Sequence, residues 1–406
     1  MNLPDKNTPV AVNFVFLVIF MAALSAFGSF VNDMYLPSLP SMTKDFHCSV
    51  PSVQLGLTMG MIGLALGQLI LGPVSDKYGR KPVLIGSLAV FIIAATVSVW
   101  SRNIHFFLWC RLCQGLGASG GYFLARTIPT DVYGGRQLAK TMAVIGAING
   151  FAPACAPVLG GFVSDRFGWQ GVFVFLAVFA AILLCSSRRL KETLPPARRF
   201  SGKIQDVFRN YLNLVRNKAF MTHTMLKGSA LGILFAYISS APFIMQTHFG
   251  YSQIHFGLII GFNALFIAAG SMSALRFRVL KRGAFVGAVI LMAAVTAESL
   301  VLWFTDSFWA YELLLLPMMF ALGMIFTVSN TLAMNEGKAD AGGASAIIGI
   351  AGYVFGAIVS PLVGLGDIMH STAIVFIAVA AIVLVCALFS RRLPADLDSQ
   401  QESTGK

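Results

Sequence analysis

The chain has 406 residues, of which 57% are hydrophobic and only 11% charged, and its mean hydropathy is +0.77. Soluble domains carry roughly 25% charged residues, so this composition excludes a soluble enzyme or binding domain and indicates a membrane protein. Twelve helical spans of about 20 residues would use about 240 residues and leave short loops, with no room for a large soluble catalytic domain.

Apolar segments follow one another along the whole chain, separated by short breaks of polar, glycine or proline residues. The first segment is longer than the apolar core of a signal peptide and is followed by further spans, so we expect a retained helix. Hydropathy places twelve spans at 10–36, 51–72, 83–101, 106–129, 139–163, 169–187, 219–246, 253–275, 284–304, 309–333, 342–366 and 371–390.

These spans predict an all-α membrane protein with two halves. We expect six spans within 1–187, a cytoplasmic linker at 188–218, and six spans within 219–406, which end in a short cytoplasmic tail. Three sequence landmarks recur in the second half at nearly the same offset, which is typical of transporters built from repeats, whose binding site lies between the halves. The pairs are Pro37 and Pro242, Arg80-Lys81 and Lys281-Arg282, and Pro157 and Pro361.

The positive charge of the chain follows its predicted topology. The formal charge is +12, from 29 Lys and Arg against 17 Asp and Glu. If both termini are cytoplasmic, the cytoplasmic segments hold 23 basic residues and the outer loops hold three. This asymmetry obeys the positive-inside rule for an even number of spans, so the charge indicates no nucleic-acid partner.

The residue types that carry enzymatic or metal chemistry form no pattern in this sequence. Cys110 and Cys113 form a C-x-x-C pair, but neither a second pair nor a thioredoxin-like context accompanies it. The six histidines all lie near predicted span boundaries, apart from any cluster of acids. The sequence therefore predicts no metal site, no cofactor and no enzyme activity.

The loop after the second span contains the string GPVSDKYGRKP, in which Gly72, Asp76, Gly79 and Arg80 are the notable residues. Glycine permits a tight turn between helices. Asp76 can accept charge-assisted hydrogen bonds from Arg80 or from a neighbouring helix terminus. We predict that this loop locks one conformation of the protein, the alternative being an ordinary basic turn.

This string resembles the loop signature of the major facilitator superfamily, and further motifs extend the resemblance. Arg111-x-x-Gln114-Gly115-x-Gly117 is similar to the superfamily motif linked with proton coupling. The span-five run Pro153-x3-Pro157-x-x-Gly160-Gly161 is similar to the antiporter motif, with Ala156 where a glycine is expected. Together with the runs at 32–40 and 191–196, they resemble the bicyclomycin/chloramphenicol-resistance (Bcr/CflA) branch of drug:proton antiporters.

The resemblance implies a major facilitator fold of two pseudo-symmetric six-helix bundles. It implies a multi-pass monomer in the bacterial inner membrane, with both termini cytoplasmic. Its implied activity is proton-coupled efflux of small amphipathic molecules or antibiotics by alternating access. The alternatives are a proton-coupled uptake symporter or facilitator for a small metabolite, and a membrane receptor that transports nothing.

Charged residues inside spans are costly and mark ion or substrate paths by default. We identify Asp33, Arg111, Arg126, Lys227 and Glu298 as such residues. Asp33 and Arg111 lie at similar depths and are predicted to meet across a cavity, where a changing environment would cycle the Asp33 carboxyl between its protonated and ionised forms. The alternative is a structural ion pair. Arg126 is expected to anchor its helix at the membrane interface or to pair with a helix terminus.

Proton coupling is accordingly assigned to Asp33 and Arg111. The candidate substrate-binding residues are Asn32, Asp33, Gln114, Asn149, Phe235 and Tyr237. The candidate residues of the conformational switch are Gly72, Asp76, Gly79, Arg80, Pro153, Pro157, Gly160 and Gly161.

Overall fold

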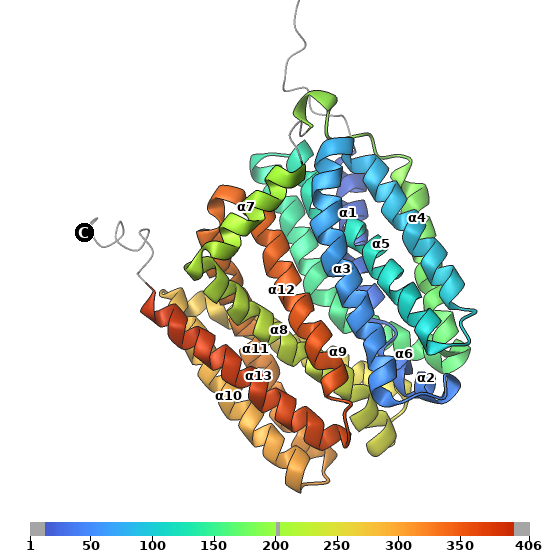
Figure 1. Ribbon diagram of the computed structural model, residues 1–406, viewed down its shortest axis with the longest axis vertical. Helices are drawn as coiled ribbons and strands as arrows, with labels where there is room; N and C mark the ends of the chain where they lie inside the picture. The colour runs from blue at the N-terminus through green and yellow to red at the C-terminus, as the bar shows by residue number, and fades with distance from the viewer. Residues whose placement is uncertain (1–12, 200–203, 394–406) are drawn as a thin grey trace, which may run out of the picture.

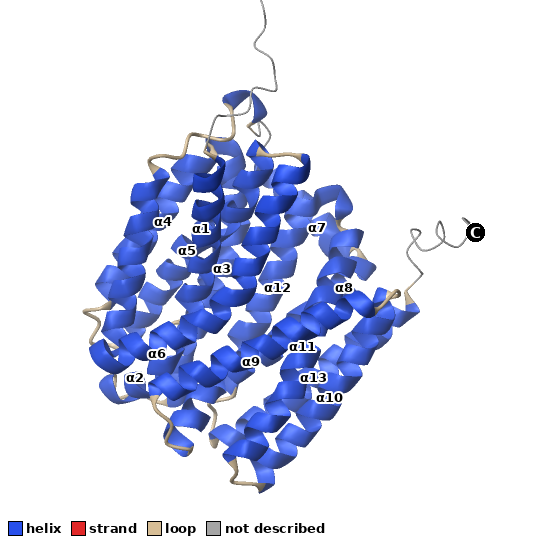
Figure 2. Cartoon of the chain, turned by 180° about the vertical axis from the view of Figure 1, so that it is seen from behind, coloured by secondary structure: helices blue, strands red, loops and turns tan. Residues whose placement is uncertain are grey.

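The computed structural model describes residues 13–199 and 204–393, and within these ranges all regular secondary structure is helical (Figures 1 and 2). Ten helices of this part are long and apolar enough to cross a membrane. The longest, α6 (Gly135–Ser187), changes direction at Gly168, whose φ of 66° favours glycine, so it contains two spans. Helix α5 (Ile104–Val132) has 29 residues, also enough for one span. The expected total of twelve spans is thereby confirmed.

Each half consists of helices that pack mainly against one another. The first half contains α1 (Phe14–Asp33), η1 (Leu36–Ser38), α2 (Leu39–Asp45), α3 (Val50–Tyr78), α4 (Arg80–Ser98), α5 and α6. The expected linker contains η2 (Pro196–Arg198) and the short helix α7 (Ile204–Arg216). The second half contains α8 (Lys218–Pro242), η3 (Phe243–His248), α9 (Gln253–Ser273), η4 (Ala274–Arg276), α10 (Leu280–Phe304), α11 (Phe308–Glu336), η5 (Lys338–Asp340), α12 (Ala341–Leu362) and α13 (Ile368–Arg392).

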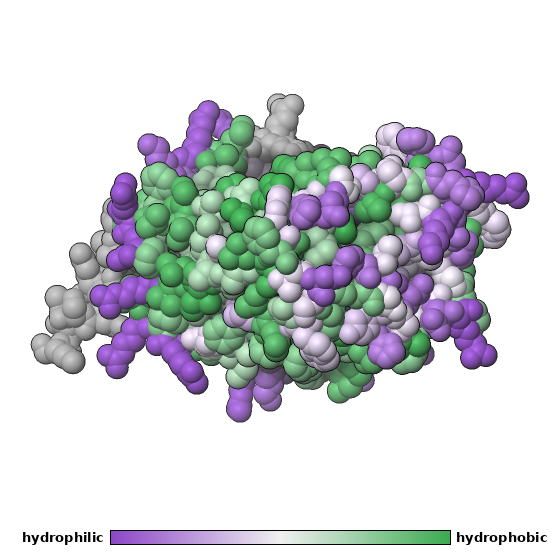
Figure 3. Space-filling model, turned by 90° about the horizontal axis from the view of Figure 1, so that it is seen from below, coloured by the Kyte–Doolittle hydropathy of each residue, from purple (hydrophilic) through white to green (hydrophobic). Residues whose placement is uncertain are grey.

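Two ends of the molecule can be distinguished by the linker. We call the end that carries α7 and the turn between α3 and α4 the linker end, and the opposite end the far end (Figure 1). Helix α1 begins and α13 ends at the linker end, since each span reverses the direction of the chain. Hydrophobic side chains on the outer surface, such as Ile93, Ile182 and Phe304, are suited to contact with lipid. Seen from below, apolar residues cover much of the molecule and hydrophilic ones gather toward its left and right margins (Figure 3).

The two halves meet through α3 against α12 and α6 against α9. Four hydrogen bonds join the halves in the far half of the molecule, within the described residues. Gln54 Nε2 donates to Ser239 O at 3.0 Å, and Gln246 Nε2 donates to Pro37 O at 3.0 Å. The other two are Thr58 Oγ1 to Ala357 O at 2.9 Å and the contact of Ser164 with Gln253. The structure is therefore closed at the far end.

Glycine makes the α6 contacts close enough to seal this end. A Cβ atom at position 161 would lie 2.6 Å from the carbonyl oxygen of Gln253, and one at position 257 would lie 2.5 Å from that of Pro157. Gly160 faces the backbone of Met34 on the other side of α6. The Pro157 to Gly161 run thus packs against both α9 and the end of α1, where a larger residue would separate the backbones.

The Gly160 contact leads to a stability prediction. Gly160→Ala would force its Cβ against Met34 O, and overpacking of this kind costs about 1–3 kcal/mol, so the thermal unfolding midpoint of the purified protein should fall. Gly146→Ala is the matched control on the same helix, because nothing lies within 4 Å of its Cβ. An unchanged midpoint for Gly160→Ala would contradict the assigned packing.

Candidate functional site

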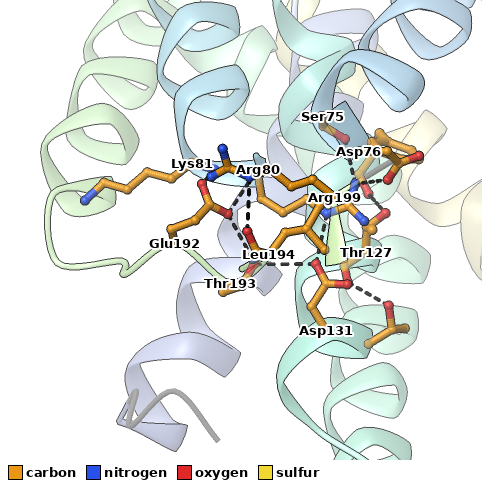
Figure 4. A network of polar contacts seen from close by, with 12 residues as sticks. Ser75, Asp76, Arg80, Lys81, Thr127, Asp131, Glu192, Thr193, Leu194 and Arg199 are labelled. Carbon is orange, nitrogen blue, oxygen red and sulfur yellow. Dashed lines mark hydrogen bonds and ion pairs between the residues drawn. The ribbon is translucent and has the colours of Figure 1, made fainter. Parts of the chain in front are cut away.

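Arg80 is the centre of a polar network at the linker end (Figure 4). Its guanidinium Nε donates to Asp131 Oδ2 at 2.9 Å, while Nη1 donates to Ser75 Oγ at 2.7 Å and to Asp76 Oδ1 at 2.5 Å. The residue is almost fully buried although it is charged. Two carboxylates therefore compensate its charge and connect the ends of α3 and α5 with the beginning of α4.

Glu192 joins the segment after α6 to the same network. Its carboxylate accepts hydrogen bonds from the backbone amides of Arg80 at 2.9 Å and Lys81 at 3.2 Å, which are the first residues of α4. A carboxylate at a helix N-terminus satisfies free amides and is favoured by the helix dipole. Gly79 allows this approach because its φ is 107° and a Cβ there would lie 2.5 Å from Glu192 Oε2.

Helix α7 lies between the linker-end network and the start of α12. Asp340 caps α12 by accepting from the backbone amide of Gly343 at 2.9 Å, and the ring of Tyr211 on α7 packs beside that glycine. Burial, together with the nearby carboxylates of Asp340 and Asp76, raises the pKa of Tyr211 to about 12, so its hydroxyl stays protonated at neutral pH. The linker helix therefore contacts the second half while it lies near Asp76 of the first.

Arg111 lies at the centre of the first bundle with no exposed surface. Its Nη1 donates to Val31 O at 3.3 Å and to Gln114 Oε1 at 2.8 Å, and its Nε donates to Gly56 O at 3.3 Å. The guanidinium also stacks over the ring of Tyr35 at 4.4 Å, which is a favourable cation–π contact. Its Nη2 group has no acceptor within the described residues.

Gln114 extends this arrangement away from the interface between the halves. Its amide nitrogen donates to Ser98 Oγ at 3.0 Å and to Ala94 O at 3.3 Å, both on α4. The residue is fully buried. Gln114 thus holds Arg111 inside the first bundle, and its side chain does not face the second half in this conformation.

Asp33 is the last residue of α1 and is partly exposed. It forms no ion pair with Arg111 in this conformation, so the expected direct meeting of the two residues is absent here. Tyr35 interacts electrostatically with both of them, so the carboxyl and the guanidinium lie near the same tyrosine. Asn32, beside Asp33, is buried and its Oδ1 accepts no hydrogen bond.

Asp33 also lies within electrostatic range of Tyr353 on α12, and therefore close to the second half. Tyr353 in turn lies near Gln68, Tyr122 and Arg126 of the first half. A Cβ on Gly349, one turn before Tyr353, would lie 2.8 Å from Gln68 Oε1. Polar groups of both halves therefore converge beside Asp33.

Arg126 and Lys227 also lie among the polar groups beside Asp33 where the two halves meet. Arg126 donates to Tyr122 Oη at 2.7 Å, and its charge interacts with Tyr353 and with Lys227, so it lies where the two halves meet. Lys227 Nζ donates to Asn330 Oδ1 at 2.7 Å. All these side chains are partly exposed, and the described residues include no ion pair to either cation. Two cations thus lie between the bundles within the predicted membrane region.

The remaining candidates lie apart from this group or at its edge. Phe235 packs between α8 and α12, with its ring 6.4 Å from that of Tyr353. Tyr237 points into the second bundle, where its hydroxyl accepts from Asn263 Nδ2 at 2.8 Å. Asn149 belongs to α6, but its side chain is outside the described part of the structure. Pro153 lies within α6, and a Cβ atom at position 72 would lie 3.6 Å from the ring of Phe123 on α5.

Several residues of these networks escaped the sequence analysis. Asp131 and Glu192 are far from Arg80 in sequence, and only folding brings them to the α4 terminus. Tyr353 and Asn330 are uncharged and therefore lacked the signal that marked charged residues. Glu312 was missed although it gave a detectable signal, because it is an acid at the fourth position of the predicted span 309–333. Its side chain is 7% exposed in the structure.

Comparisons with known proteins agree with this architecture. The family model described as Major Facilitator Superfamily matches residues 15–361. The chain is 33% identical over 383 residues to the MFS-type transporter YdgK of Bacillus subtilis (strain 168), covering 91% of this chain and 95% of YdgK. It is 30% identical over 233 residues to the multidrug resistance protein MdtL of Escherichia coli (strain K12), covering 57% of this chain and 59% of MdtL.

Solved structures show the same fold at low sequence identity. The partially occluded inward-open conformation of the xylose transporter XylE from E. coli superposes with a TM-score of 0.73 at 13% identity, covering 95% of this chain and 98% of XylE. A bacterial homolog to the human lysosomal transporter Spinster, in an inward-facing and occupied conformation, gives a TM-score of 0.72 at 14% identity, covering 93% and 96% of the two chains.

The Glu192 cap leads to a second prediction. Glu192→Gln removes the charge that the α4 amides and the helix dipole stabilise, so we expect a loss of about 1 kcal/mol and a lower thermal unfolding midpoint. The exposed acid Asp165 provides the control variant Asp165→Asn, which should leave the midpoint unchanged. Equal midpoints for both variants would show that the cap contributes nothing to stability.

Proposed function

Because the chain belongs to the major facilitator superfamily, we propose that it is a proton-coupled antiporter that exports small amphipathic molecules, including antibiotics, by alternating access. The observation that carries the proposal concerns Asp33 and Arg111. Among the described residues, Asp33 is a partly exposed acid without an ion-pair partner, and the buried Arg111 near it has an unused donor. The similarity to MdtL and the antiporter-like run in α6 support export and placement in the bicyclomycin/chloramphenicol-resistance branch.

The orientation follows from the basic residues at the linker end. The positive-inside rule favours a cytoplasmic linker end with both termini inside the cell. The bacterial relatives support a location in the bacterial inner membrane. The conformation closed at the far end then faces inward and receives substrate from the cytoplasm. The opposite state requires the far-end contacts to break and the linker ends to approach, and the Asp76–Arg80 network lies where that closure would occur.

Protonation of Asp33 would change its partner. When the carboxyl is protonated it needs no counter-ion, as in the present arrangement, where Arg111 donates only to backbone carbonyls and Gln114. When the carboxyl is ionised, Arg111 Nη2 is an unused cationic donor of the same bundle with which it could pair. Because Arg111 also holds Val31 O, two residues before Asp33, such a pairing would shift the end of α1 against the second half.

Substrate would bind where the halves converge beside Asp33. Phe235, Tyr122 and Tyr353 provide aromatic surface, while Gln68, Arg126 and Lys227 provide hydrogen-bond donors for acceptor groups on the substrate. A mainly apolar lining with a few directional polar groups suits amphipathic ligands. The driving force suffices for accumulation, because each proton charge gains about 2.3 kcal/mol per 100 mV and about 1.4 kcal/mol corresponds to a tenfold gradient.

The test uses inverted vesicles energised to an acidic interior, with bicyclomycin, chloramphenicol and a cationic dye added in turn. Substrate should release protons from the wild-type vesicles. Asp33→Asn should abolish this release and uphill accumulation, because an amide cannot exchange a proton at this position. The readouts are a pH-sensitive dye in the vesicle interior and accumulation of the compound.

Asp165→Asn, which replaces an exposed acid, should behave as wild type. Proton movement together with the substrate, in the same direction, would replace export by uptake symport. Uphill export by Asp33→Asn at the wild-type rate would show that Asp33 does not couple transport to protons.

A further inference from the structure

Two acids are buried inside the second bundle, far from Asp33. Glu298 on α10 is 0% exposed and Glu312 on α11 is 7% exposed. Each interacts electrostatically with the other and with Tyr237 of α8 and Tyr311 of α11. Four helices of one bundle therefore converge on one polar cluster, since Asn263 of α9 lies between Tyr237 and Glu312.

The cluster contains more acceptor capacity than the protein fills. Both oxygens of Glu298 lack a hydrogen-bond partner within the described residues, and Glu312 has only the amide of Asn263 beside it. Asn263 Oδ1 and Tyr311 Oη also lack a partner within the described residues, and each of these two residues is 1% exposed. Unfilled acceptors at this burial are costly, so a ligand with positive charge or donor hydrogens must complete the cluster.

The helices packed around the two acids bring no compensating cation. The titratable groups that face them are Tyr237 from α8 and Tyr311 from α11, while α9 contributes the uncharged Asn263. Helix α13 packs on α10 through the bond from Ser299 Oγ to Ala373 O at 3.2 Å. His370 of α13 is exposed and stacks on Trp303. No described lysine or arginine forms an ion pair with either acid.

A divalent metal does not suit the cluster, because no group of three or more His, Cys, Asp or Glu ligands exists in the described residues. Two ionised carboxylates at this depth, without a cation, would combine the cost of burying charge with mutual repulsion. One proton removes the mutual repulsion and one of the two buried charges, a second proton removes the other charge, and neither needs additional space. Each protonated carboxyl also donates a hydrogen bond to a neighbouring acceptor, which the cluster has in excess.

We propose that Glu298 and Glu312 form a second proton-binding site, located in the second bundle and separate from Asp33. Asn263, Tyr237 and Tyr311 position the two carboxyl groups. The site does not depend on the direction of transport, and it goes beyond the coupling role proposed for Asp33.

The helices that hold this site also form the far-end closure. Two residues after Tyr237, Ser239 accepts from Gln54 of the first half through its carbonyl and donates to Ser360 O at 3.0 Å. Helix α9, which holds Asn263, also provides Gln253 and Gly257 to the contact with α6. Tyr311 also belongs to an aromatic cluster with Phe249 and Phe308. Proton binding would therefore act on the elements that must separate when the far end opens.

Infrared spectroscopy of the full chain in lipid nanodiscs tests the proposal without a known substrate. The chain contains five glutamates, and the other three are Glu192 in the linker-end network, Glu336 at the end of α11 and Glu402. Labelling glutamate alone with 13C shifts the C=O stretch of protonated glutamic acid and leaves that of aspartic acid in place. At neutral pH we expect a label-shifted protonated-acid band in the wild-type protein, which persists in Asp33→Asn.

Glu298→Gln and Glu312→Gln should each remove part of this band, and Glu192→Gln should leave it intact. The wild-type measurement decides the question even if these variants fail to fold: absence of a label-shifted band at neutral pH in sodium-free buffer overturns the proposal. A band that disappears when sodium is added shows a sodium site instead and also overturns it. This experiment measures no transport. A negative result would therefore overturn the second proton-binding site and would not bear on the coupling role proposed for Asp33.

Discussion

The structure depends on how buried charges are compensated in a medium that solvates them poorly. The buried charges differ in the kinds of partner that compensate them. Arg80 is held by two carboxylates, whereas Arg111 is held by two backbone carbonyls, a side-chain amide and an aromatic face. The charge of Arg80 is therefore fixed by permanent partners, but that of Arg111 retains an unused donor. Groups that lack a permanent partner are the ones able to respond to a proton or a substrate.

A second constraint is the close approach of helices where the halves meet. Glycine at positions 161 and 257 brings the backbones of α6 and α9 together, and Gly160 lets α6 contact the end of α1. The antiporter-like run therefore touches both the interface between the halves and the helix that ends at Asp33. Motion of α1 and opening of the far end involve the same contact, which gives a physical reason for small residues there.

Much of the fold could be predicted from the sequence because lipid imposes a simple rule on each span. About 20 apolar residues must occur in sequence for every crossing, so hydropathy located all twelve spans. It could not locate their ends, since α3 continues to Tyr78 and α5 to Val132, beyond the apolar runs. It also did not show that the linker contains a helix, because α7 gains its stability from packing on α8 and α12.

The sequence by itself determined the number of spans, the turn at Gly79, and the charged residues within the apolar runs, because hydropathy, glycine and charge act locally. Only the tertiary structure decided which groups meet. It brought Glu192 to the start of α4, directed Arg111 to backbone carbonyls rather than to Asp33, and buried Glu298 beside Glu312. These pairings join residues that are distant along the chain, and they follow from the packing of whole helices, which no local pattern encodes.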